Sequence, residues 1–213
     1  MDVVAILLAA GESERMGTSK ALLPWHGQTL LAHQLRQIQR SRITECVVVL
    51  GREADSLAPI VESSRRLTWK SRAVYNPRYR EGKTTSIQAG LASLFSRPDG
   101  VIVAAVDQPL DRRLLDALLR RGEEEWEWGG VPGRRTILVP VFQGRRGHPP
   151  LFSGALIGEL MGICEEREGL RAVVRRDPGR VLEVPWDSPE VLLNLNAAAD
   201  LPPAARPGGP GAR

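Results

Sequence analysis

Three segments rich in apolar residues have the length of buried strands. They are Val3 to Ala10, Glu45 to Leu50 and Val101 to Val106, and each is followed directly by a glycine or an aspartate. Continuous apolar runs of this length are typical of parallel strands that are covered on both faces. We therefore expect these segments to be strands of a buried sheet.

Between these strands, apolar residues recur with the spacing of helices. The predicted helices are Gln28 to Arg40, Glu53 to Ser63, Thr84 to Phe95, Arg113 to Arg121, Phe152 to Met161 and Leu170 to Arg176, followed by a short closing helix. Further strands are expected at Arg72 to Tyr75, Ile137 to Phe142, Val181 to Pro185 and Val191 to Leu195. Pro59 limits the regularity of the second helix. This alternation predicts an α/β fold with a doubly wound, mostly parallel sheet.

The length of 213 residues, with 42% apolar and 25% charged residues, fits one large globular domain. We expect that domain to cover residues 1–201, with a small β lobe added at about 122–150. The remaining residues, 202–213, read PPAARPGGPGAR and are expected to form a disordered tail.

Charge and cysteine content exclude several classes of protein. The net charge of +4 is spread over scattered arginine pairs separated by acidic blocks such as Glu123 to Glu125, which argues against nucleic-acid binding. Cys46 and Cys164 have neither metal-ligand nor disulfide-framework spacing, so we expect a cytoplasmic setting. Val3 to Ala10 is too short to span a membrane and lacks the flanks of a signal peptide.

The loop after the first strand, LAAGESERMGTSK, is a candidate anion site. It brings Arg15 and Lys20 together around Gly11 and Gly17, and glycine lets backbone amides approach a phosphate closely. Lys20 is one of few lysines in an arginine-rich chain, and lysine offers a compact point charge. The spacing is neither a Walker A loop nor GxGxxG, so an ordinary solvent loop stays an alternative.

Asp107 ends an otherwise apolar strand. An isolated carboxylate is costly to bury there without a partner, and Mg²⁺ is one suitable partner because it takes one or two carboxylates plus phosphates and water. The alternative is a turn or helix-capping aspartate before Pro109.

Five segments occur in an order that resembles a known family. They are LAAGESERMGTSKALLP (8–24), NPRYREGKTTSIQAGL (76–91), AAVDQPL (104–110), GRRGHPPLF (144–152) and LNLNAAADL (193–201). Together they resemble the MobA-like NTP transferases, most closely the molybdopterin cytidylyltransferase branch. The resemblance covers roughly residues 3–201 and implies the nucleotide-diphospho-sugar transferase type of Rossmann-like fold.

The resemblance also implies roles for individual residues. Nucleotide-binding positions are Leu8, Ala9, Ala10, Gly11, Gly82, Thr84, Thr85 and Ser86; catalytic positions are Arg15, Lys20 and Asp107. Asp107 would bind Mg²⁺, with Asn196 as a further candidate ligand, and Gly147 and His148 would face the acceptor. The late motif departs from the family, because Asn194 and Asn196 stand where carboxylates are usual.

The implied reaction is transfer of CMP from CTP to the terminal phosphate of molybdopterin, with release of pyrophosphate. Ala10 stands where the guanylyltransferase branch has glycine, which favours CTP over GTP. The implied partners are the nucleoside triphosphate, a molybdopterin-type molecule, and an apo-molybdoenzyme or its chaperone. Other phosphorylated acceptors, GTP as donor, and a non-catalytic cofactor-binding module stay as alternatives.

The other two histidines and one pair of tryptophans are interpreted as structural residues. His26 fits a turn and His33 a structural position within a helix. Trp126 and Trp128 could stack on a pterin, but anchoring of the added lobe is the favoured interpretation.

Overall fold

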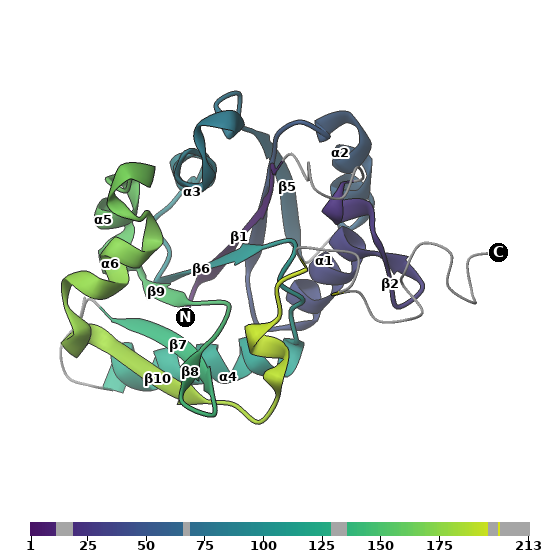
Figure 1. The fold of residues 1–213 in the computed structure, drawn as a ribbon. Coiled ribbons are helices and arrows are strands. Elements are labelled where there is room, and N and C mark those ends of the chain that lie inside the picture. Colours follow the sequence, from purple (N-terminus) through teal and green to yellow (C-terminus); the bar gives the residue numbers. More distant parts are fainter. Residues whose placement is uncertain (12–18, 66–68, 129–135, 196–199, 201–213) are drawn as a thin grey trace.

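An eight-stranded sheet lies at the centre of the molecule, with helices on both faces (Figure 1). The computed structural model describes residues 1–11, 19–65, 69–128, 136–195 and 200. The strands are β1 (Val3–Ala9), β4 (Glu45–Leu50), β5 (Lys70–Tyr75), β6 (Gly100–Ala105), β7 (Ile137–Phe142), β8 (Arg145–Arg146), β9 (Leu151–Ser153) and β10 (Val181–Pro185). Their order is β10-β7-β9-β6-β1-β4-β5, with β8 paired to β7. A separate hairpin joins β2 (Pro24–Trp25) to β3 (Gln28–Thr29).

Six α-helices of the described chain form the two outer layers. They are α1 (Leu30–Arg40), α2 (Ala54–Ser63), α3 (Lys83–Ala92), α4 (Arg112–Glu123), α5 (Ile157–Met161) and α6 (Leu170–Arg176). Buried residues of α1, α2 and α4 pack in one core cluster, and those of α3, α5 and α6 pack in another. This arrangement confirms the predicted α/β fold with a mostly parallel sheet.

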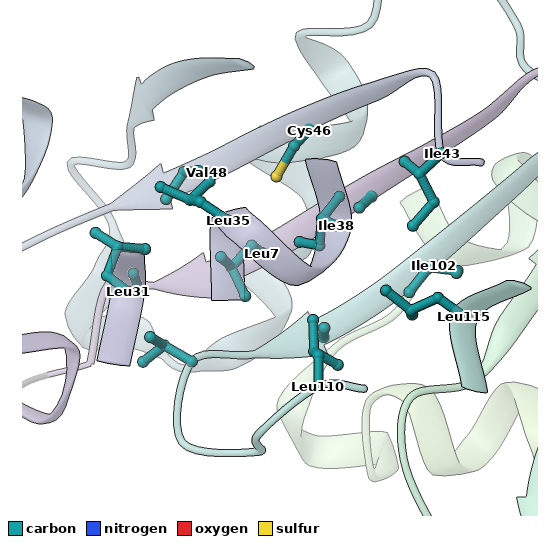
Figure 2. Packing of buried hydrophobic residues seen from close by; sticks show 14 of the residues in the cluster. Leu7, Leu31, Leu35, Ile38, Ile43, Cys46, Val48, Ile102, Leu110 and Leu115 are labelled. Carbon is teal, nitrogen blue, oxygen red and sulfur yellow. The ribbon is translucent and has the colours of Figure 1, made fainter. Parts of the chain in front are cut away.

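The pattern of β1 explains the two cores. All seven of its residues are buried, and alternate side chains of a strand point to opposite faces. Leu7 therefore packs with the first cluster, where Leu35 and Ile38 of α1 lie above the sheet (Figure 2), while Ile6 belongs to the second. A strand covered on both faces must be apolar throughout, as the sequence predicted.

Two predicted elements are wrong. The segment 152–161 begins not with a helix but with β9, and the helix α5 starts only at Ile157. Val191 to Leu195 is not a strand, because the chain forms a 3-10 turn at Pro189–Leu192. The Glu190 amide in this turn donates to the Ser188 hydroxyl oxygen. The predicted closing helix and tail lie almost wholly outside the described residues.

The end of α3 also differs from the prediction. The helix stops at Ala92, so Phe95 leaves the apolar stripe and is 89% exposed. Its ring lies 4.9 Å from the Arg72 guanidinium carbon, a cation–π contact.

The segment expected as an added lobe continues the main sheet. It supplies β7 and β8, and β9 joins them to β6 through antiparallel pairs on both sides. Trp126 lies in the π-helical turn Glu124–Trp128 that follows α4 and packs close to Gly100, where an added Cβ would come within 2.7 Å of the indole ring. Trp126 therefore packs against the sheet, as the anchoring interpretation predicts. The side chain of Trp128 lies outside the described residues.

Among the residues that the structure describes, no helix is both long and apolar enough to cross a membrane. Cys46 and Cys164 are both free thiols.

Candidate active site

The carboxyl ends of four parallel strands meet at one edge of the sheet. β1 lies between β4 and β6, and β5 pairs with β4, all in parallel register. The Val106 amide donates to the Leu8 carbonyl (2.9 Å), which places the turn at Asp107 beside the segment Leu8 to Gly11. Ligands of doubly wound sheets bind outside this edge.

The segment after β1 is closely packed from the β4 side. Leu8, Ala9 and Ala10 are buried, and the first residue after β4 is Gly51. A Cβ on Gly51 would lie 2.5 Å from the Ala10 carbonyl oxygen and 2.8 Å from the Tyr79 ring. Glycine is therefore required there for the two loops to touch.

Lys20 and Asp107 form an ion pair at this edge. Lys20 begins a short 3-10 turn, Lys20–Leu22, and its Nζ lies 2.8 Å from Asp107 Oδ2. Their side chains are only 18% and 14% exposed, so water screens this pair less than a surface pair. The structure thus brings together two residues 87 positions apart that the sequence assigned to one site.

The late segment supports the Asp107 turn from another side. The Leu195 amide donates to the Asp107 carbonyl (2.9 Å), and Gln108 Nε2 donates to Asn194 Oδ1 (2.8 Å). The Asn194 side-chain oxygen therefore accepts a hydrogen bond from the Asp107 turn, so it is already engaged by a protein group. Arg15 and Asn196, two predicted site residues, lie outside the described residues.

The first turn of α3 holds the other predicted nucleotide positions. Thr84, Thr85 and Ser86 are buried, and Gly82 precedes the helix with φ of 114°, a conformation that favours glycine. Asn76, after β5, donates from Nδ2 to the hydroxyl oxygens of Thr85 (3.0 Å) and Ser86 (2.9 Å). A single buried amide thus fixes the start of α3 to the strand edge.

Replacement of Asn76 with alanine is expected to destabilise the protein by about 1–3 kcal/mol, because buried hydrogen-bonding groups lose a partner. The start of α3 would also loosen, so the KM for the nucleotide that the family resemblance implies should rise more than kcat falls. Denaturant unfolding and steady-state kinetics check this. As a control, Ser63→Ala removes an exposed bond to the Ile60 carbonyl and should leave both measurements near wild type. Equal effects of the two variants would contradict the prediction.

Glu165 is a contact that sequence reasoning missed. Its Oε1 accepts a hydrogen bond from the Thr84 amide (2.8 Å), and its side chain lies against Gly82, where a Cβ would come within 2.4 Å of it. A carboxylate at a helix N-terminus is favourable because the helix dipole is positive there. No local motif marks Glu165, since the bond spans 81 residues.

The predicted acceptor-side residues dock on the late segment. The His148 amide donates to the Val191 carbonyl (2.8 Å), and the Gly147 amide donates to the Pro140 carbonyl (2.8 Å). The approach is close, because a Cβ on Gly147 would lie 2.4 Å from the Val191 oxygen.

The Gly147→Ala variant is expected to be less stable by about 1–3 kcal/mol, the usual cost of forcing extra atoms into packed structure. The added methyl meets backbone rather than a flexible side chain, so the acceptor segment must shift. Thermal unfolding measures the stability loss. Gly144→Ser is a contrasting variant. Its φ of 73° imposes backbone strain, but no atom of the described residues beyond its chain neighbours lies within 4 Å of an added Cβ, so any loss of stability there comes from strain and not from a clash. A Gly147→Ala protein as stable as wild type would refute the close docking.

The electrostatic environment of His148 links it to the same edge. Burial and then the positive charge of Lys83 lower the pKa of the imidazole; Asp107 opposes this shift, and Arg171 adds to it. The pKa of His33 is lowered as well, first by burial and then by His26. Both imidazoles are therefore disposed to be neutral near pH 7.

The two lowered pKa values predict a loss of stability in acid. An unfolded histidine titrates near pH 6.5, so below about pH 6.5 the unfolded chain binds protons that the folded chain takes up only at lower pH. The free energy of unfolding should decrease as pH falls from 7 to 5. His148→Gln and His33→Gln should each weaken that decrease in pH-dependent urea unfolding. An unchanged slope in both variants would count against the shifts.

The residues present fit a Mg²⁺ site in which the protein supplies few ligands and a bound phosphate compound and water supply the others. Across the described ranges, no group of three or more histidine, cysteine, aspartate or glutamate side chains is placed to hold a metal ion. Asp107 offers a carboxylate at the edge, and Mg²⁺ commonly takes one or two carboxylates with phosphates and water. A structural zinc site, which needs four protein ligands, does not match this donor set.

Comparison with known proteins identifies the type of domain. The family described as the MobA-like NTP transferase domain matches residues 5–181. The chain is 30% identical over 203 residues to the bifunctional protein GlmU of Rhizobium rhizogenes, covering 93% of this chain but 40% of that relative. It is 29% identical over 182 residues to the nicotine blue oxidoreductase of Paenarthrobacter nicotinovorans, covering 83% of each.

A solved structure shares the fold over almost the whole chain. The crystal structure of Rv0371c from Mycobacterium tuberculosis H37Rv superimposes with a TM-score of 0.71 at 25% identity, covering 94% of this chain and 95% of that one. By contrast, the chain spans about two fifths of the length of the GlmU relative.

Proposed function

The chain belongs to the MobA-like NTP transferase family, and on that premise we propose that it transfers a nucleotidyl group from a nucleoside triphosphate to a phosphorylated acceptor, releasing pyrophosphate. The observation that carries the proposal is the Lys20–Asp107 pair at the edge where β1 and β6 end. A shielded cation and carboxylate at this place suit a reaction between two anions.

In the proposed reaction, an oxygen of the acceptor's terminal phosphate attacks the α-phosphorus of the triphosphate. The new P–O bond forms as the bond to the β-phosphate oxygen breaks, and pyrophosphate leaves. Lys20 neutralises negative charge that spreads over the α-phosphate and the leaving group. The loop Leu8 to Gly11 and the first turn of α3 hold the nucleoside in register, which supplies positioning.

Asp107 is the residue proposed to hold Mg²⁺, and Asn196 is the second candidate ligand. When bound at such a site, Mg²⁺ supplies charge neutralisation on the phosphates. The Lys20 ammonium contacts the Asp107 carboxylate directly, and this contact holds the carboxylate at the edge of the sheet.

The finer proposal is that the donor is CTP and the acceptor is molybdopterin. Ala10 is 5% exposed. A methyl group at this position of the loop would reduce the space beside a bound base, which favours a pyrimidine over a purine. Gly147 and His148 would face the acceptor, since both lie on the segment that docks next to the Asp107 turn through Val191 and Leu195.

The experiment that tests the function is pyrophosphate release with Mg²⁺, CTP or GTP, and molybdenum-loaded molybdopterin, against a control without the pterin. Release with CTP that requires the pterin is the expected result. Release with GTP alone would overturn the argument from Ala10. Binding of CTP without release would direct the search to other phosphorylated acceptors, and absence of nucleotide binding would favour a non-catalytic module.

A further inference from the structure

Gln34 is a buried polar residue on an otherwise apolar helix face. The buried residues of α1 are Leu30, Leu31, Gln34, Leu35 and Ile38, and the Gln34 side chain is 0% exposed. A buried amide is costly unless its hydrogen-bonding groups are satisfied. Its partners therefore show why it is tolerated there.

All the partners of Gln34 lie on the turn that carries Asp107. Nε2 donates to the Val106 carbonyl (2.9 Å) and to the Gln108 carbonyl (2.8 Å), and Oε1 accepts from the Leu110 amide (2.9 Å). Both amide hydrogens and the amide oxygen are used. The two carbonyls flank Asp107 in the sequence, so one side chain holds the main chain on both sides of it.

Two backbone hydrogen bonds also hold this turn. The Gln108 amide donates to the Ala105 carbonyl (3.0 Å) and closes the turn, while Pro109 has no amide hydrogen to donate. The Leu195 amide bonds the Asp107 carbonyl. Gln34 and Leu195 thus fix successive carbonyls of the same three-residue stretch, 106 to 108.

We propose that Gln34 is a positioning residue that sets the backbone at Asp107, and through it the carboxylate on which the metal and Lys20 depend. This inference rests on the proposed function for its kinetic part. A displacement of about 1 Å in a catalytic group can cost up to two orders of magnitude in rate. Loss of the three Gln34 hydrogen bonds should therefore reduce turnover more than it reduces nucleotide affinity.

The test compares Gln34→Met with Gln37→Met. Methionine matches glutamine in length and lacks its hydrogen bonds. Gln37 lies one turn along α1 and its Oε1 accepts from the exposed Arg112 amide (3.1 Å), so the second variant removes the same type of bond outside the Asp107 turn. If Gln34→Met does not fold, Gln34→Asn serves instead, because it keeps an amide but is too short to reach all three backbone partners.

Two readouts are needed. Amide hydrogen exchange of a peptide covering residues 104–110 should be about tenfold faster in the Gln34 variants and unchanged in Gln37→Met. In pyrophosphate release, kcat should fall about tenfold or more, KM for CTP should stay within about twofold, and the Mg²⁺ concentration for half-maximal rate should rise. In titration calorimetry, the same variants should need a higher Mg²⁺ concentration to reach the increase in CTP affinity that Mg²⁺ gives to the wild-type protein.

The outcomes separate the inference from the proposed function. Unchanged exchange at residues 104–110 overturns the claim that Gln34 holds the backbone of this turn. Faster exchange with unchanged kcat and unchanged Mg²⁺ dependence overturns the positioning role. If wild-type protein releases no pyrophosphate with any nucleotide, the proposed function fails, and hydrogen exchange together with the Mg²⁺ effect on CTP binding still decides whether Gln34 positions Asp107.

Discussion

Replacement of Asp107 with alanine is expected to reduce turnover about 100-fold or more, in line with the removal of one electrostatic stabiliser from an active site. The carboxylate is the partner of Lys20 at 2.8 Å and the proposed Mg²⁺ ligand, so its loss affects two charges at once. Pyrophosphate release at saturating CTP measures the effect. Raised Mg²⁺ should not restore the rate, because the protein ligand itself is gone.

Asp111 provides a matched control for Asp107. It lies four residues later and its Oδ1 accepts from the Arg113 amide (2.7 Å) as the N-cap of α4. Asp111→Ala should therefore cost about 1 kcal/mol of stability and leave turnover unchanged. If Asp107→Ala also kept its turnover, Asp107 would be a turn aspartate and the alternative considered from the sequence would be correct.

The Lys20→Ala variant should lose turnover to a similar extent, for a different reason. Its ammonium is proposed to neutralise phosphate charge, and a reaction that develops charge in the transition state is sensitive to the loss of such a group. The variant also leaves Asp107 without its partner in a place that is only 14% exposed. Both kcat and CTP affinity should fall, as measured by steady-state kinetics and calorimetry.

Two further substitutions sharpen the Lys20 test. Lys20→Arg keeps the charge but replaces a compact ammonium with a wide planar fork, so only partial recovery is expected. Lys70→Ala removes an exposed lysine at the start of β5 and should leave turnover at the wild-type value. Full activity of Lys20→Ala would exclude this residue from the chemistry.

The buried strands could be predicted because their environment leaves a simple pattern. β1, β4 and β6 lie inside the sheet with helices on both faces, so nearly every position must be apolar. Helices α1 and α4 were predicted within one or two residues of their observed bounds, apart from the short hairpin strand β3 ahead of α1. Here local composition and tertiary burial agree.

The segment 152–161 shows where such reasoning fails. Phe152, Leu156 and Leu160 are spaced four apart, as on one face of a helix, and all are fully buried. The chain reaches the same core through a strand, a 3-10 turn and a short helix in succession. Spacing alone could not show this, because the pairing of β9 with β6 and β7 is set by residues distant in the sequence.

The candidate site divides in the same way. The sequence placed Lys20 and Asp107 in one site, and the structure has them in contact. Gln34 and Glu165 were missed, although Gln34 had a readable signal: it is the polar residue at the centre of the stripe formed by Leu30 and Ile38. Glu165 had none, because its role depends on the approach of two loops.

The bonds from Asn194 and Leu195 to the Asp107 turn have a consequence for the making of the protein. Gln108 and its partner Asn194 are 86 residues apart, so the turn is synthesised long before its last supports. A nascent chain that has reached β9 already contains β1, β4, β5 and β6, which pair with one another. The paired strands that carry the candidate site can thus form during translation, whereas the Asp107 turn gains its last supports only after the final described strand and the segment beyond it have emerged.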